Sequence, residues 1–175
     1  MGSLHWKFFI VLIFANQSAM ATLAPRMYTI MAQMSGSIYQ ISDIAGNTSY
    51  NNKISLELLY LVREGPTFGG RYIYESRNEN ESNVGQAYGP MAGYYTSSGF
   101  FVLFNYDILA KLGRWTNGEG AEASAGYLEH IGDQMHIGAK FSVRKIRYKT
   151  DITNNTAVNK NVSDQFPSLI LMYLF

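Results

Sequence analysis

The sequence predicts an all-β chain, an eight-stranded antiparallel up-and-down barrel whose strands cross a membrane. Three observations lead to this prediction. Segments in which apolar and polar residues alternate recur along the chain, and the segments that connect them alternate between long and short. The composition combines 13 Tyr, 10 Phe and 16 Gly with only 4 Pro in 175 residues. Aromatic residues favour strands, and glycine permits the tight turns and sharp coiling of barrels.

Composition excludes several other classes. The 14 basic and 13 acidic residues give a formal charge of +1, which does not suit a nucleic-acid-binding protein. Cysteine is absent, so disulfides, thiolate metal sites and cysteine nucleophiles are excluded. The only long apolar run lies near the N-terminus and mean hydropathy is −0.09, which excludes a bundle of membrane-spanning helices.

Residues 1–21 have the layout of a signal peptide. Lys7 precedes an apolar stretch from Phe8 to Ala15, and Ala19-Met20-Ala21 fits the small-residue cleavage pattern. A permanent anchor is the alternative, but the apolar stretch is too short to span about 30 Å of hydrocarbon as a helix. We therefore expect a signal peptide over 1–21 and a barrel over 22–175. Cleavage would leave 13 basic and 13 acidic groups, because Lys7 is the one charged residue removed.

Two segments show the two-residue period of a strand most clearly. In 54–63, Ile54, Leu56 and Leu58 lie on one face, and Glu57 lies on the other. In 135–144, five apolar side chains face away from Lys140 and Arg144. Six further strands are expected over 27–41, 68–77, 86–96, 100–111, 121–131 and 167–175. Strands of about nine to fifteen residues are long for a globular protein and suit tilted membrane strands.

The connections differ in length by parity. Long ones rich in Asn, Ser, Thr and Gly are expected over 42–53, 78–85, 112–120 and 150–166, and short ones over 64–67, 97–99 and 132–134. An outer-membrane barrel has short turns on its periplasmic side and long loops outside. A soluble β-sandwich has no reason to sort its loops in this way.

The short turns predict a strand register. If Gly132-Asp133-Gln134 is a three-residue loop, Ile131 pairs with Met135 and His130 with His136. The same register pairs Ser124 with Ser142, Glu122 with Arg144 and Ala125 with Phe141, so that polar residues face polar ones. A three-residue loop at Ser97-Ser98-Gly99 places glycine where a left-handed conformation is needed. Pro90 falls inside a strand and requires a bulge.

An outward apolar face leaves four basic and four acidic side chains facing the interior. They are Glu57, Arg63, Arg71, Glu75, Asp107, Glu122, Lys140 and Arg144, joined by Gln33, Asn105, Ser124 and Ser142. Charges in a dry interior have to be paired, and eight strands leave a lumen that side chains can fill. These residues therefore predict a closed polar plug. Alternation alone is equally compatible with a soluble barrel that carries the charges on its outer surface.

The last strand ends the chain on Phe175, with Leu169, Leu171 and Tyr173 on the same face. In this respect the sequence resembles bacterial outer-membrane β-barrels, and in particular the small eight-stranded barrels of the OmpX and OmpA-domain kind. The resemblance implies location in the outer membrane, contact with its lipid, and recognition of Tyr173 and Phe175 by the barrel-assembly machinery. It names no ligand for the outer loops.

Little in the sequence indicates catalysis. His130 and His136 would face each other across a hairpin, as half of a metal site or as ordinary rim residues, and no third ligand has a useful spacing. We expect no cofactor and no metal. A structural or surface-interaction protein working through loops 42–53 and 150–166 is the first hypothesis. A lipid A deacylase-like enzyme and a soluble lipocalin-like carrier are the alternatives; the enzyme would need Ser, His and an acid together near the outer leaflet.

Overall fold

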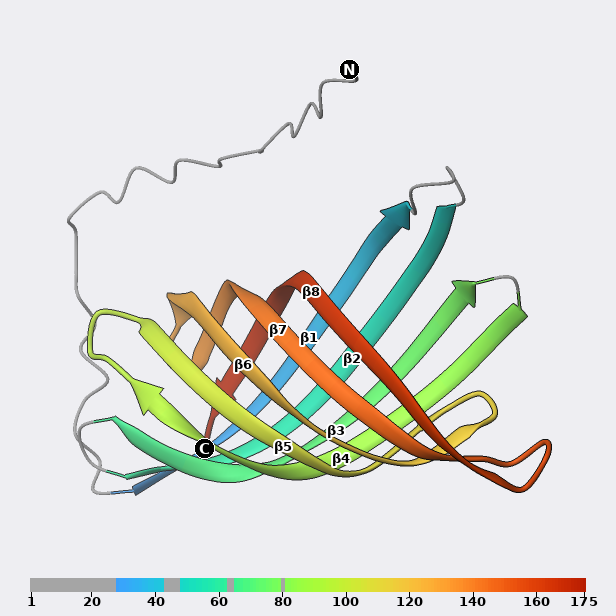
Figure 1. The fold of residues 1–175 in the computed structure, drawn as a ribbon. Coiled ribbons are helices and arrows are strands. Elements are labelled where there is room, and N and C mark those ends of the chain that lie inside the picture. The colour runs from blue at the N-terminus through green and yellow to red at the C-terminus, as the bar shows by residue number, and fades with distance from the viewer. Residues whose placement is uncertain (1–27, 43–47, 63–64, 80) are drawn as a thin grey trace, which may run out of the picture.

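The structure is a computed structural model, and it describes residues 28–42, 48–62, 65–79 and 81–175. The expected signal peptide, 1–21, and the candidate interior residue Arg63 lie outside the described residues. Eight strands form one closed antiparallel barrel in which each strand pairs with its neighbours in sequence and β1 pairs with β8 (Figure 1). The strands are β1 (Tyr28–Ser42), β2 (Thr48–Val62), β3 (Pro66–Glu79), β4 (Glu81–Tyr95), β5 (Phe100–Leu112), β6 (Trp115–Gly132), β7 (Met135–Asp151) and β8 (Thr156–Leu174).

This architecture confirms the predicted all-β class, strand number and up-and-down order. None of the described residues forms a helix long and apolar enough to span a bilayer. Tyr28 and Phe175 lie at the same end of the barrel, which we call the terminal end, together with the β2–β3, β4–β5 and β6–β7 connections. The other four connections lie at the opposite end, which we call the polar end.

The expected long loops at the polar end are wrong in extent. Most of their residues continue the strands, so the β5–β6 connection shrinks to residues 113–114 and the β7–β8 connection to 152–155. Strand β8 begins at Thr156, eleven residues before the predicted start at Pro167. Backbone pairing continues where both faces are polar, and a hydrophobic pattern cannot detect a strand of that kind.

The predicted hairpin registers hold with one exception. His130 pairs with His136, Ser124 with Ser142, Glu122 with Arg144 and Ala125 with Phe141, as expected. Met135 pairs with Gly132 instead of Ile131, because the register shifts between His130 and Gly132 and shortens the turn to residues 133–134. An extra residue in one strand of the pair absorbs the difference.

The expected loop at Gly99 and the expected bulge at Pro90 are both confirmed. Gly99 has a φ of 89°, and the amide of Gly99 donates to the carbonyl of Thr96, which closes the three-residue loop. The register of β4 against β5 shifts between Tyr88 and Met91, which is where Pro90 required a bulge. Proline has no amide hydrogen to donate to the ladder, and the irregularity accommodates it.

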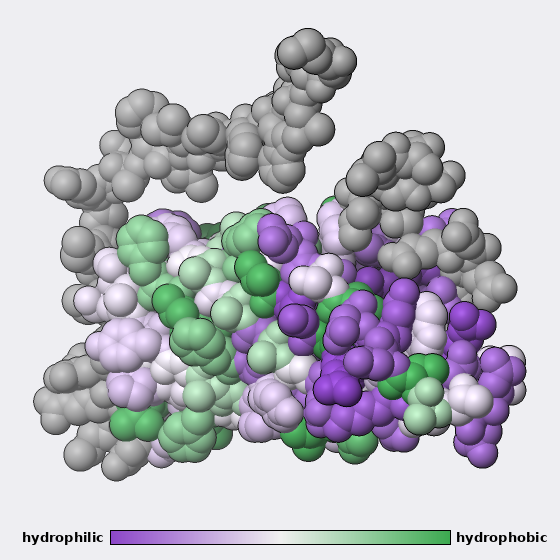
Figure 2. Space-filling model, in the orientation of Figure 1, coloured by the Kyte–Doolittle hydropathy of each residue, from purple (hydrophilic) through white to green (hydrophobic). Residues whose placement is uncertain are grey.

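Inward and outward positions differ sharply in chemistry. Inward side chains include most of the buried charges, whereas outward ones include Leu58, Phe104 and Phe141, which are 60%, 60% and 50% exposed. Figure 2 shows that apolar side chains gather over the half nearer the terminal end, and that polar ones cover the half where β7 turns into β8. Most tyrosines and phenylalanines of the described strands face outward, but Tyr148 is fully buried because its position in β7 faces inward.

Apolar and polar side chains follow one another in groups along the inward face of β5. Strand β5 shows the order: Phe101 and Leu103 come first, Asn105 and Asp107 next, and then Ala110 and Leu112. The first two belong to an apolar cluster at the terminal end, with Met31, Leu59, Met91, Tyr95, Leu128, Ile170 and Met172. The last two belong to a second apolar cluster, with Ile73, Ala87, Ile146 and Tyr148. On β3, Ile73 of the second cluster lies between Arg71 and Glu75, so the second cluster lies beside the charged residues, while the first cluster separates them from the terminal end.

Candidate functional site: the buried charge network

Seven of the eight interior residues expected from the sequence are described, and all seven are buried inside the barrel. Their exposed fractions lie between 0% for Asp107 and 4% for Arg71 and Lys140, and the set comprises Glu57, Arg71, Glu75, Asp107, Glu122, Lys140 and Arg144. They come from β2, β3, β5, β6 and β7, and the two-residue period directs all of them to the lumen. Strand alternation alone therefore gathers them from five strands.

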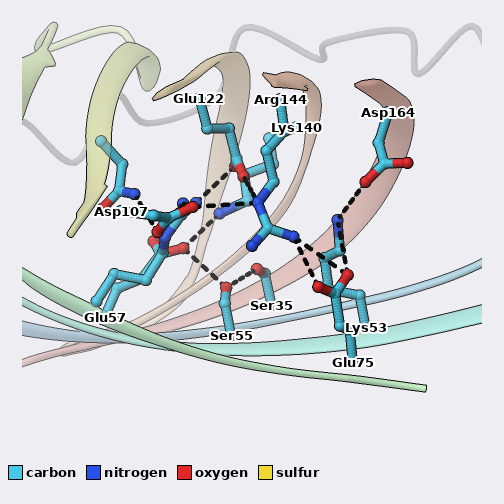
Figure 3. A network of polar contacts seen from close by, with 12 residues as sticks. Ser35, Lys53, Ser55, Glu57, Glu75, Asp107, Glu122, Lys140, Arg144 and Asp164 are labelled. Carbon is cyan, nitrogen blue, oxygen red and sulfur yellow. Dashed lines mark hydrogen bonds and ion pairs between the residues drawn. The ribbon is translucent and has the colours of Figure 1, made fainter. Parts of the chain in front are cut away.

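Arg144 lies at the centre of the network (Figure 3). Its Nε donates to Asp107 Oδ2 at 3.1 Å and its Nη1 donates to Glu75 Oε2 at 3.1 Å. Glu122, its register neighbour on β6, is farther away, with 4.0 Å between Arg144 Nε and Glu122 Oε2. The pairing of Glu122 with Arg144 expected from the register thus holds for the backbone, while the arginine reaches across the lumen to β3 and β5.

Arg71 is the closer partner of Glu122. The distance from Arg71 Nη1 to Glu122 Oε1 is 2.7 Å, and Arg71 Nη2 donates to Asp107 Oδ1 at 3.2 Å. Asn105 Nδ2 also donates to Asp107 Oδ1, at 2.8 Å. Asp107 therefore accepts from two guanidinium groups and one amide, which offsets the cost of burying its charge.

A second group surrounds Glu57, nearer the terminal end. Lys140 Nζ donates to Glu57 Oε1 at 2.6 Å, and Ser55 Oγ donates to the same oxygen at 2.8 Å. Gln33 Nε2 donates to Glu57 Oε2 at 2.5 Å, and the Tyr95 hydroxyl in turn donates to Gln33 Oε1 at 2.9 Å. This chain of contacts links the charges to the apolar cluster that contains Tyr95.

Sequence reasoning missed three members of the network, Lys53, Arg77 and Asp164. Arg77 pairs with Asp164, Nη2 to Oδ2, at 2.5 Å and with Glu75 at 3.1 Å. Lys53 Nζ lies 3.7 Å from Asp164 Oδ2 and 3.6 Å from the ring centroid of Phe166. Lys53 and Asp164 fall in the long loops expected from the sequence, and Arg77 falls at the end of an expected strand. Each lies two residues from another inward position, so the two-residue period carried the signal.

The network is electrically balanced among the described residues. Its members are five basic and five acidic side chains: Lys53, Arg71, Arg77, Lys140 and Arg144 against Glu57, Glu75, Asp107, Glu122 and Asp164. A sixth buried acid, Asp151, lies outside the network and pairs with Arg114 at the polar end. Every one of the network's carboxylates has a basic nitrogen within 3.2 Å. Charges paired this closely hold strands in place, because removing one partner leaves an uncompensated charge in a dry interior.

The two described histidines lie apart from this network, at the terminal end. His130 Nδ1 and His136 Nε2 are 3.4 Å apart, and the rings meet edge to face with centroids 4.9 Å apart. His136 is buried and His130 is exposed. Within the described part of the chain, no group of three or more His, Cys, Asp or Glu residues is arranged to hold a metal ion.

The C-terminal residues proposed as an assembly signal lie on the outer surface. Tyr173 and Phe175 pack edge to face with ring centroids 4.8 Å apart, and they are 39% and 61% exposed. The Phe175 amide donates to the carbonyl of Ile30 at 2.9 Å, and the Tyr173 hydroxyl donates to Gln134. The chain end is therefore fixed to β1 and to the β6–β7 turn.

No protein-family model and no curated protein matches the sequence. Among solved structures, a de novo designed transmembrane β-barrel superposes with a TM-score of 0.49 at 13% identity, over 84% of this chain and 95% of the designed one. OmpT of Vibrio cholerae, expressed in the outer membrane, superposes with a TM-score of 0.33 at 11% identity, over 85% of this chain and 52% of OmpT. These likenesses concern barrel architecture alone.

Proposed function

We propose that this protein is an integral outer-membrane β-barrel with a closed polar interior and a structural or surface-interaction role, without catalysis. The observation that carries the proposal is the distribution of polarity. The ten charged side chains of the network are buried in the lumen, while large apolar residues face outward on every strand. A soluble barrel would carry its charged side chains outside and its apolar side chains inside. Exposed apolar surface on this scale indicates a membrane or a large interface.

The outward apolar band has suitable dimensions. On β7, its outward positions are Met135, Ile137, Ala139, Phe141 and Val143. These residues span about 26 Å of strand, or about 20 Å of height if the strand tilts by about 40°. With the side chains at both ends included, the height of the band approaches that of the apolar belt, about 25 Å, that outer-membrane barrels present to lipid.

Aromatic side chains border this band, as the interfaces of a membrane favour. At the terminal end, Tyr60 packs against Phe68 and Phe100 against Tyr127, with ring centroids 5.3 and 5.0 Å apart. Nearer the polar end, the outward tyrosines include Tyr72, Tyr74, Tyr88 and Tyr106. We assign the terminal end to the periplasm and the polar end to the cell exterior.

The finer resemblance to OmpX and OmpA barrels, the signal peptide and the barrel-assembly machinery as partner belong to the same proposal. The strand number and Phe175 support the resemblance and the role of the machinery, and the sequence of residues 1–21 supports the signal peptide. Because the polar segments extend the strands, the surface available to a partner is the polar end itself, with its strand edges and turns. His130 and His136 hydrogen-bond to each other, and they lie at the end opposite the outer leaflet. Because a deacylase-like enzyme needs its histidine near the outer leaflet, this position favours a non-catalytic role.

Cell fractionation with unheated and heated gel samples tests this proposal. The protein should sediment with outer membranes, and the folded barrel should migrate differently before and after boiling. Recovery in a soluble fraction, or identical migration of both samples, would favour the soluble carrier instead.

A further inference from the structure

The charged residues on the outer surface are distributed unevenly. Exposed outward cations of the described strands occur on β5 and β7 only, namely Lys111, Lys145, Arg147 and Lys149. Glu119 on β6 neutralises one of them, because its carboxylate lies 2.6 Å from Lys149 Nζ. No ion pair among the described residues joins Lys111, Lys145 or Arg147 to a carboxylate. These four cations, which we call the basic patch, therefore carry net positive charge on one side of the barrel.

The basic patch begins where the apolar band ends. On β7 the outward series passes from Phe141 and Val143 directly to Lys145, Arg147 and Lys149. At the terminal end of the same side, the exposed charges have the opposite sign, at Glu129 and Asp133. Cations at the upper border of an apolar band are at the level of lipid headgroups, and they attract phosphate groups there.

An apolar groove lies on the same side, below the patch. Its floor includes Ala125 and Gly126 of β6, and its walls are Val102 of β5 and Phe141 of β7, on either side of Ala125 in the register. Ala123, flanked by Phe104 and Val143, and Ala121, flanked by Tyr106 and Lys145, continue the outward row of β6 up to the patch. From Tyr127 at the bottom to Ala121 at the top, the row measures about 20 Å, which is the length of an extended lipid acyl chain.

We propose that this side of the barrel is a binding site for one class of ligand, a membrane lipid with a net negative phosphate-bearing headgroup. The phosphate contacts Lys145 and Arg147, with Lys111 and Lys149 beside them, and one acyl chain lies along the groove over Ala123 and Ala125. The cations of the basic patch favour a negatively charged headgroup. The apolar groove below them favours a phosphate that is attached to an acyl chain. The inference rests on the proposed membrane location and adds to it a specific lipid and a specific side.

Lipid retention measured by native mass spectrometry tests the inference. The purified protein, folded in a zwitterionic detergent, is incubated with equal amounts of phosphatidylglycerol and phosphatidylcholine that carry the same acyl chains. The heat-dependent gel shift is recorded first for every variant, so that failure to form a barrel, which would count against the proposed function, is distinguished from failure to select a lipid. The wild-type barrel should retain phosphatidylglycerol in preference.

Two sets of variants separate headgroup from chain. Replacing Lys145, Arg147 and Lys149 together by Gln should reduce retention of phosphatidylglycerol about tenfold or more, because each cation beside an anionic lipid surface contributes about fivefold in binding. Lys160→Gln, which removes an exposed cation outside the patch, should leave it unchanged. Ala123→Phe should reduce retention by filling the groove, and Ala92→Phe, on the outward face of β4, should not.

Competition with inorganic phosphate distinguishes binding of a whole lipid from binding of a phosphate group alone. Added at the same concentration as the lipid, it should displace nothing. Equal retention of both lipids, an unchanged preference in the triple Gln variant, or displacement by inorganic phosphate would each overturn the inference.

Discussion

At the scale of single residues, Arg144 carries the most concentrated set of buried contacts. Its side chain is fully enclosed and bonds to carboxylates from two other strands, Asp107 and Glu75. Arg144→Met should lower the free energy of unfolding by about 3–5 kcal/mol, because both carboxylates lose a partner in a dry interior.

Denaturant titration of the barrel refolded in detergent measures this loss. Arg147→Met, an outward exposed position on the same strand, is the matched control and should change stability by less than about 0.5 kcal/mol. Equal losses for the two variants would mean that the interior charges do not stabilise the barrel.

The pair of Lys140 and Glu57 makes a second prediction at this scale. Lys140→Met and Glu57→Gln should each destabilise the barrel, since each removes one partner of a bond of 2.6 Å in a buried site. The double variant should lose less than the sum of the two, with a coupling of about 2 kcal/mol in a double-mutant cycle. Additive losses would show that the two charges act independently.

At the scale of elements, the end of β8 separates stability from assembly. Phe175 is more than half exposed, so deleting it should cost the finished barrel only about 1–2 kcal/mol of stability. We expect a much larger loss of outer-membrane protein in cells, because the assembly machinery would read the terminal aromatic residue during insertion.

The measurement compares cellular outer-membrane levels with refolding of purified chains into detergent. Phe100→Ala, which removes another exposed aromatic side chain at the terminal end, controls for lost surface area. Unchanged cellular levels after deletion, or a block in refolding without any cellular component, would contradict a role in assembly.

The elements also show how far sequence reasoning reaches. The period of two identified eight strands in the right order, and the turn at Gly99 and four of the five β6–β7 pairings followed from turn length and polarity. The positions at which strands stop at the polar end could not be predicted, because β8 begins with eleven residues whose two faces are both largely polar. Lys53 and Asp164 were missed for the same reason.

The partners of the interior charges could not be predicted either. Register fixes which backbone positions are neighbours, and it does place Glu122 opposite Arg144. Arginine side chains are long enough to cross the lumen of a small barrel, so Arg144 bonds to Glu75 and Arg71 to Glu122. These contacts depend on the closure of the barrel, which no single pair of strands reveals.

At the scale of the whole molecule, the closed interior predicts electrical silence. The lumen is filled by paired charges and by two apolar clusters, which leaves no room for an aqueous channel. In a planar bilayer the purified protein should therefore give no stable openings of porin size. Such openings, recorded repeatedly with protein that shows the heat-dependent gel shift, would contradict the closed interior.

Site-directed spin labelling measures directly whether the outward apolar band lies in lipid. The chain has no cysteine, so single cysteines can be introduced for labelling without removing any residue first. Labels at Leu58, Phe104 and Val143 represent the band, a label at Asn161 represents the outer surface at the polar end, and a label at Ser142 represents the interior. Collision with oxygen, which concentrates in lipid, is compared with collision with a water-soluble nickel complex in protein reconstituted in vesicles. We predict that the three band labels collide with oxygen and are shielded from nickel, that Asn161 collides with nickel, and that Ser142 is shielded from both. Band labels that collide with nickel as readily as Asn161 would show that this surface faces water, and would contradict the membrane barrel.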